Sequence, residues 1–137
     1  MRVHNWKNPV SFVAPEKSEP VLDCDQAVVK CLYIDPGQQA KPHFHDTAVD
    51  VMVIVQGSGT ATVDGKERRV GPGDVILNPP GTLHGIRNDG NERIVWLVIQ
   101  SPPPNRKAKE AVGRIRPAEA EIEKWARVVK ASGVRID

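Results

Sequence analysis

Four side chains in the middle of the sequence are of types that could together hold a metal ion: His43, His45, Asp50 and His84. His43 and His45 are separated by one residue, and residues i and i+2 of a strand point to the same side of a sheet. Two imidazoles on one side begin a site for one divalent ion of Fe, Mn, Ni or Zn. Alone, the pair is better explained as two surface histidines, so the prediction depends on the other members.

Asp50 interrupts an apolar run, VDVMVIVQ, that extends from Val49 to Gln56. A carboxylate within such a run is costly to bury unless a cation or a donor pairs with it. If the run is an alternating strand, Asp50 shares one face with Met52 and Ile54, and a cation held by the histidines would be its partner. The alternative is that this face points to solvent and Asp50 is an ordinary exposed carboxylate.

The third histidine follows a turn. The segment Pro79-Pro80-Gly81 presets the backbone and delivers His84 to the beginning of another strand, on the same side as Ile86. Taken by itself, His84 is better explained as an ordinary core or turn histidine. The three histidines and Asp50 therefore gain weight only as a set.

Short apolar runs separated by Gly, Pro, Asn and Asp must position these residues, and no helical pattern intervenes between the runs. This arrangement predicts an antiparallel sandwich or barrel. Asp64-Gly65 is a strong two-residue hairpin signal, because both turn positions favour positive φ. The predicted strands are 27–34, 49–56, 60–63, 67–70, 75–77, 83–87 and 93–100.

The spacing of these residues resembles that of the cupin superfamily at both of its signature motifs. The first motif is glycine, five residues, HXH, three or four residues, glutamate, six residues and glycine, and here it reads Gly37-QQAKP-HFH-DTAV-Asp50-VMVIVQ-Gly57. The second is glycine, five residues, Pro-X-Gly, two residues, histidine, three residues and asparagine, and here it reads Gly73-DVILN-PPG-TL-His84-GIR-Asn88. Every fixed position matches except one, because Asp50 stands where the family has glutamate.

The resemblance implies an all-β fold, the cupin double-stranded β-helix or jelly-roll barrel, with His43, His45 and His84 as metal ligands and Asp50 at the acid position. Three or four protein ligands leave coordination positions open for water, substrate or O2. Aspartate is one methylene shorter than glutamate, so its carboxylate stops roughly 1.5 Å short. Direct ligation, action through a water, and acceptance of a proton from a ligating histidine all stay open for Asp50.

The other site residues follow from strand alternation. If Lys30 faces solvent, then Cys31 and Tyr33 face the cavity, as does Val29. Tyr33 and Asp50 are the candidates for moving protons, while Gln100 is better explained as an exposed strand end than as a pocket amide. The predicted pocket is mostly apolar and comprises Cys31, Met52, Ile54 and Ile86.

A small-molecule metalloenzyme is the function favoured by the resemblance: a dioxygenase, isomerase or lyase acting on a small oxygenated substrate. The alternative is a non-catalytic cupin that binds or senses a small ligand through its metal. The formal net charge of +2 does not indicate a nucleic-acid partner. No apolar run approaches the roughly 20 residues that span a membrane. Residues 1–10 do not resemble a secretory signal, so we expect a cytoplasmic protein.

The 137 residues fit one compact domain. We expect an N-terminal arm at 1–22, the barrel at 23–104 and a helical tail at 105–137. Within the tail, Ala118, Ile122, Trp125 and Val129 lie on one face of a predicted C-terminal α-helix over 117–132. We also expect a homodimer, because exposed edge strands are usually paired or covered and because the resemblance points to dimers.

Overall fold

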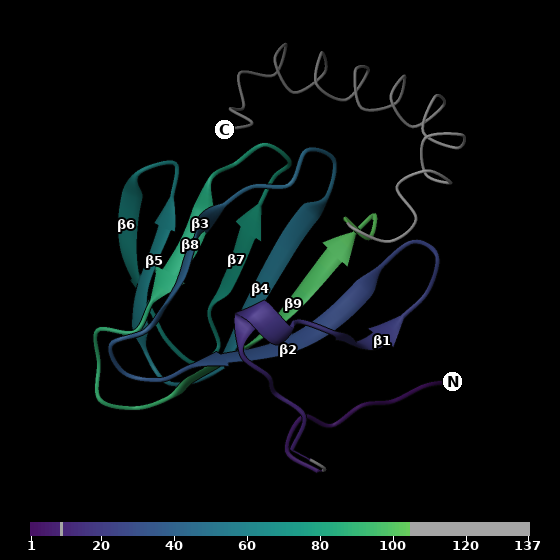
Figure 1. Ribbon diagram of the computed structural model, residues 1–137, viewed down its shortest axis with the longest axis horizontal. Helices are drawn as coiled ribbons and strands as arrows, with labels where there is room; N and C mark the ends of the chain where they lie inside the picture. The colour runs from purple at the N-terminus through teal and green to yellow at the C-terminus, as the bar shows by residue number, and fades with distance from the viewer. Residues whose placement is uncertain (9, 105–137) are drawn as a thin grey trace.

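Two antiparallel sheets make up the protein in the computed structural model, which describes residues 1–8 and 10–104 (Figure 1). One sheet has the order β1-β2-β9-β4-β7 and the other the order β3-β8-β5-β6. The strands are β1 (Pro20–Asp23), β2 (Val28–Ile34), β3 (Gln39–His43), β4 (Val49–Gln56), β5 (Gly59–Val63), β6 (Lys66–Val70), β7 (Val75–Asn78), β8 (His84–Arg87) and β9 (Ile94–Ser101), with a 3-10 helix, η1, at Pro15–Lys17. The all-β prediction is confirmed, and the predicted C-terminal α-helix lies outside the described residues.

The hairpin between β5 and β6 has the turn that the sequence predicts. Asp64 has a φ of 49° and Gly65 a φ of 79°, and Val63 pairs with Lys66 across the turn. Positive φ at both central residues gives a turn whose twist matches that of the flanking strands. This hairpin fixes the register of the sheet that carries His84, because β5 also pairs with β8.

Alternation along β4 separates a buried face from a half-buried one. Asp50, Met52 and Ile54 are buried, while Val51 and Val53 are partly exposed. The buried face of β4 joins a core that includes Trp96, Ile34 and Ile86. Asp50 therefore shares a face with Met52 and Ile54, and that face is turned inward rather than to solvent.

The alternation of β2 is the reverse of the one predicted. Lys30 and Leu32 line the inner pocket, so Cys31 and Tyr33 point to the outer face of the sheet, together with Val29. Cys31 is nevertheless 0% exposed, so the outer face of β2 is covered at this position. The prediction that Cys31 and Tyr33 face the cavity was wrong.

The N-terminal segment covers the outer side and the edge of β2. Val13 donates a backbone hydrogen bond to Cys31 O (3.0 Å) and accepts one from Tyr33 N (3.1 Å). The Phe12 ring packs edge-on against Tyr33 at 5.2 Å, and the Arg93 guanidinium lies 4.2 Å from the Tyr33 ring centroid. These contacts explain why Tyr33 faces away from the site.

The boundary expected between arm and barrel, at residue 22, falls inside β1. β1 and β3 were not predicted as strands: one begins with a proline at a sheet edge and the other, QAKPH, lacks an apolar alternation. Within residues 1–8 and 10–104, no helix has the length and apolar character needed to cross a membrane.

Candidate metal centre

Three histidine side chains converge where β3 and β8 meet. His43 ends β3 and pairs with His84, which begins β8, while His45 follows two residues after His43. One potential ligand nitrogen from each ring lies within 4.8 Å of the others. The ring centroids of His43 and His84 are 4.5 Å apart, and those of His45 and His84 are 5.7 Å apart. The pairing of the two strands thus brings together residues that are distant in sequence.

Backbone carbonyls orient two of the rings. His43 Nδ1 lies 2.8 Å from Lys41 O, and His84 Nδ1 lies 2.9 Å from Thr82 O. A carbonyl oxygen only accepts, so Nδ1 carries the proton and donates in both rings. In a neutral imidazole this leaves the Nε2 lone pair available as a metal ligand.

The strongest evidence for a metal at this site is the environment of the Nε2 atom of His84. It is buried and has no hydrogen-bond partner among the described residues. A buried polar atom without a partner is costly, and native structures rarely leave one unexplained. A divalent ion held by His43, His45 and His84 would supply the partner, so the residues present fit such an ion.

Asp50 stands beside the histidines and is 3% exposed. Its Oδ2 atom lies 3.4 Å from His45 Nε2 and 3.6 Å from His84 Nε2. Both distances exceed those of ordinary hydrogen bonds. The Oδ1 atom has no hydrogen-bond partner among the described residues. The carboxylate therefore lies next to two of the three rings, close to the position of any ion that the histidines would bind.

The electrostatics of the centre favour an ionised Asp50 and shift the pKa values of His45 and His84 in opposite directions. Burial by itself would raise the pKa of Asp50, but its interactions with His84 and Gln100 hold that pKa below the usual value. Burial lowers the pKa of His45. Burial also acts to lower the pKa of His84, yet Asp50 and Thr82 O raise it overall. The centre thus contains an ionised carboxylate next to imidazoles, a ligand set that divalent transition metals favour.

Gln100 belongs to this centre, although the sequence favoured an exposed strand end. It is 5% exposed, and its Nε2 donates to Asp50 Oδ2 at 3.1 Å and lies 3.3 Å from His45 Nε2. The signal that could have placed it is the alternation of β9, where Gln100 follows the inward-facing Val98 and Trp96. Using that signal requires knowing which face of β9 is inside.

A pocket of about 230 Å³ opens beside the centre. Met52 and Ile86 line it, whereas Ile54 lies in the adjoining core. The predicted pocket members Cys31 and Tyr33 are absent from its described wall, and Lys30 is present. The full wall is Pro15, Ser18, Lys30, Leu32, Ala40, His43, His45, Asp50, Met52, His84, Gly85, Ile86, Trp96, Val98 and Gln100.

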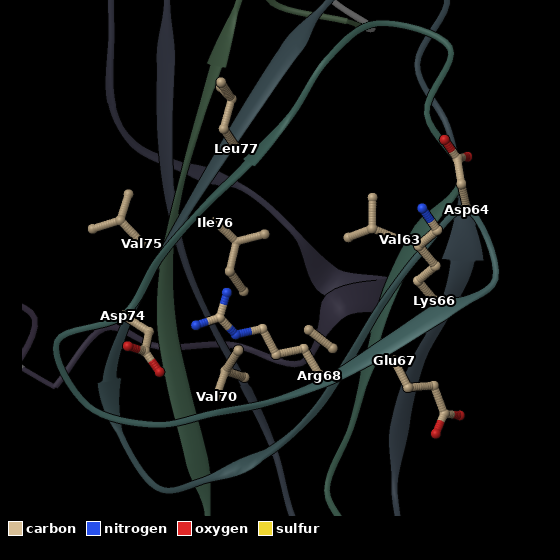
Figure 2. A pocket seen from close by; sticks show the side chains of 11 residues that line it. Val63, Asp64, Lys66, Glu67, Arg68, Val70, Asp74, Val75, Ile76 and Leu77 are labelled. Atoms are coloured by element: carbon tan, nitrogen blue, oxygen red, sulfur yellow. The ribbon is translucent and has the colours of Figure 1, made fainter. Parts of the chain in front are cut away.

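A larger hollow of about 760 Å³ lies elsewhere, between the β5–β6 hairpin and β7. Figure 2 shows its side chains, which run from Val63 to Val70 on the hairpin and from Asp74 to Leu77 on and before β7. It separates the open edges of the two sheets. Its described wall contains no histidine or cysteine, so the chemistry of the donor atoms, and not cavity size, locates the candidate site.

Comparison with known proteins agrees with this fold. The cupin domain family matches residues 32–100. A gentisate 1,2-dioxygenase of Ralstonia sp is 44% identical over 69 residues, which are 50% of this chain and only 19% of that protein. A Thermus thermophilus protein of known structure aligns with a TM-score of 0.65 and 27% identity, over 74% of this chain and 98% of that one.

A Klebsiella pneumoniae subsp. pneumoniae protein with a double-stranded beta-helix domain is similar in fold. It aligns with a TM-score of 0.66 and 22% identity, over 77% of this chain and 92% of that one. The family match includes all three histidines and Asp50. The chain therefore belongs to the cupin superfamily.

Proposed function

We propose that this cupin is a metal-dependent enzyme acting on a small oxygenated molecule that binds in the pocket beside His43, His45 and His84. The observation that carries the proposal is the convergence of three imidazole nitrogens on the wall of an open pocket. A metal bound there would supply Lewis acidity toward a substrate oxygen or a place for O2. The protein offers three or four ligands, which leaves room for a small molecule.

Dioxygenation is the reaction to test first, because the dioxygenase relative is 44% identical to this chain over 69 residues. Isomerase and lyase chemistry fit the same donor set. Asp50 is the residue we assign to proton transfer or direct ligation, since it is ionised, buried and next to two of the rings. Tyr33 has no such role, because it faces the other side of β2.

One observation favours a second candidate, a cupin that binds a small ligand without turnover. Asp50 is the single carboxylate among the described residues that line the pocket, and it already accepts a hydrogen bond from Gln100. A reaction that needs two separate carboxylates for proton transfer would lack one of them. Ligand binding requires only the metal and the apolar wall.

The test combines metal content with activity. Protein purified without chelators is expected to hold one divalent ion per chain, and His84→Ala to lose it. His4→Ala is the matched control, because His4 lies outside the centre and bonds Ser11 Oγ at 2.5 Å. Oxygen consumption is then measured with gentisate and other small hydroxy acids.

Metal-loaded protein that turns over none of these compounds, yet is thermally stabilised by one of them, would favour the binding function. Wild-type protein that takes up none of Fe, Mn, Ni and Zn contradicts both functions. The expected cytoplasmic location stays a prediction.

We also propose that the protein forms a homodimer through the outer face of its five-stranded sheet. The ladder places apolar residues side by side on this face, in two rows: Leu77, Val51 and Ile99 in one, and Val75, Val53 and Leu97 in the other. Val75 is 64% and Leu77 61% exposed. A contiguous apolar surface of this kind usually marks a contact with another protein.

A further inference from the structure

Lys30 places a cation on the inner face of the sheet. The ladder pairs Lys30 with Val98, and Val98 with Met52, so these three residues form one row across the pocket wall. The neighbouring row contains Gln100 and Asp50. Inward positions of a small barrel are usually filled by apolar side chains, and a buried ammonium is costly unless it is paired.

The ammonium of Lys30 has no close counterion in the described part of the chain. No carboxylate there lies within 4.0 Å of it, and no hydrogen bond satisfies it. Asp50 is the charge that acts on Lys30 from a distance, but the Oδ2 atom of Asp50 already faces His45, His84 and Gln100. Burial lowers the pKa of Lys30, and the attraction of Asp50 only partly opposes it. Lys30 is half-buried, so the pocket wall carries an ammonium that no carboxylate of the described residues pairs at close range.

With a divalent ion at the histidines, the formal charges around the pocket would favour an anionic ligand. Lys30 and Asp50 cancel each other formally, and a divalent ion at the histidines would leave the pocket positive. An anionic ligand would restore the balance in a partly enclosed space, where charges are screened less than in water.

We propose that Lys30 binds the carboxylate of the pocket's ligand, so that this cupin takes small carboxylic acids that direct a second oxygen to the histidines. This inference rests on the proposed function, because it uses the same pocket. The Cα atoms of Lys30 and Asp50 are separated by two strand spacings of about 4.8 Å across the sheet and by one two-residue step of about 6.8 Å along the strands. The two displacements are perpendicular, so the direct distance is about 12 Å. A molecule with oxygen-bearing groups at both ends can therefore contact both Lys30 and the histidines, which line the same pocket.

The wall between the two ends selects the body of the ligand. Leu32, Ile86 and Trp96 line it with apolar surface. A pocket volume of about 230 Å³ suits a ligand of one small ring or a short chain. The class is therefore a compact hydroxy or oxo monocarboxylate.

The test uses salicylate and its neutral amide, salicylamide, which share a ring and a hydroxyl group and differ in charge. Binding of each is measured by calorimetry to zinc-loaded protein. We expect wild-type protein to prefer salicylate, and Lys30→Met to bind salicylate about tenfold to a hundredfold more weakly while its affinity for salicylamide hardly changes. Lys30→Arg should recover most of the affinity, and Lys66→Met, at an exposed lysine on β6, should behave as wild type.

Several outcomes would overturn the assignment of Lys30. These are wild-type protein that binds both probes equally or neither, Lys30→Met that binds salicylate as wild type does, and Lys30→Met that loses both probes to the same extent. Metal content is measured for every variant. Wild-type protein without metal contradicts the proposed function, and in that case the comparison of salicylate with salicylamide in the metal-free protein still decides the role of Lys30.

Discussion

Replacing Asp50 with asparagine removes one negative charge from the metal centre and keeps the shape of the side chain. The carboxylate is 3% exposed, and its Oδ2 atom lies 3.4 Å and 3.6 Å from the Nε2 atoms of His45 and His84. Solvent therefore screens it little. We expect Asp50→Asn to lower the affinity for a divalent metal more than any substitution outside the three histidines.

The size of the loss distinguishes the roles open to Asp50. A residue that acts through a ligating histidine typically changes metal affinity by about tenfold to a hundredfold, or about 1.4–2.8 kcal/mol. Two unit charges about 4 Å apart at an effective dielectric constant of about 20 interact by about 4 kcal/mol. A loss above about a thousandfold would thus indicate direct ligation by Asp50, and a smaller one an indirect role.

The assay is a competition titration of zinc against a chelating dye. Asp25→Asn is the control, because Asp25 is an exposed acid away from the pocket. Asp50→Glu adds the missing methylene and should retain or increase the affinity if the acid binds the metal directly. Equal zinc affinities for Asp50→Asn and wild type would refute the reasoning, since they would show that the buried carboxylate does not interact with the ion.

Three further changes test other parts of the structure. Gln100→Leu should lower the free energy of unfolding of the metal-free protein by about 1–3 kcal/mol in urea titrations, because the buried Asp50 loses its donor. Burial raises the pKa of Cys31 from 9.0 to about 11. The unfolded thiol therefore ionises first, and the free energy of unfolding should fall as pH rises from 9.0 to about 11, by on the order of 2 kcal/mol. Cys31→Val should remove that part of the pH dependence in urea titrations. Leu77→Glu should raise the dissociation constant of the homodimer by at least about a hundredfold, as measured by light scattering over a dilution series, because each copy would bury a charge in place of an apolar side chain.

Each of these changes has its own control and contrary result. Gln39→Leu, at an exposed glutamine, is the control for Gln100→Leu and should leave the free energy of unfolding nearly unchanged. If both variants lost the same free energy, the loss in Gln100→Leu could not be attributed to the contact with Asp50. An unchanged pH profile in Cys31→Val would show that the thiol is hydrated. Leu83→Glu is the control for Leu77→Glu, because Leu83 is an exposed leucine outside the outer sheet face. A dimer that survives Leu77→Glu must use another surface.

The motifs located the histidines well because a spacing pattern reports backbone geometry directly. The preset turn before His84 and the two positive-φ residues of the β5–β6 turn are local properties, whereas β3 ends at His43, so strand alternation alone does not account for the position of His45. Local properties can be read from a few neighbouring residues. The predicted strands followed from them, apart from β1 and β3, whose prolines and polar residues hide the alternation.

The facing of β2 and the place of Gln100 could not be predicted in the same way. Both depend on which side of a strand is covered, and that is decided by a distant segment. Phe12 packs against Tyr33 on the outer side of β2 and Val13 bonds to the strand's edge, while Lys30 lies on the inward-facing side. An amphipathic lysine can extend its methylenes along an apolar wall, so the residue type alone did not exclude this arrangement.

The contacts of Gln100 also bear on how the protein folds. They join β9 to residues 55 and 50 positions earlier in the sequence, His45 and Asp50, and the pocket wall further includes Pro15 and Ser18. Loop closure over such separations costs entropy before any contact rewards it, so chains dominated by distant pairings fold slowly. We therefore expect the three histidines to come together late in folding, so that metal uptake during refolding would report the completion of the barrel rather than its nucleation.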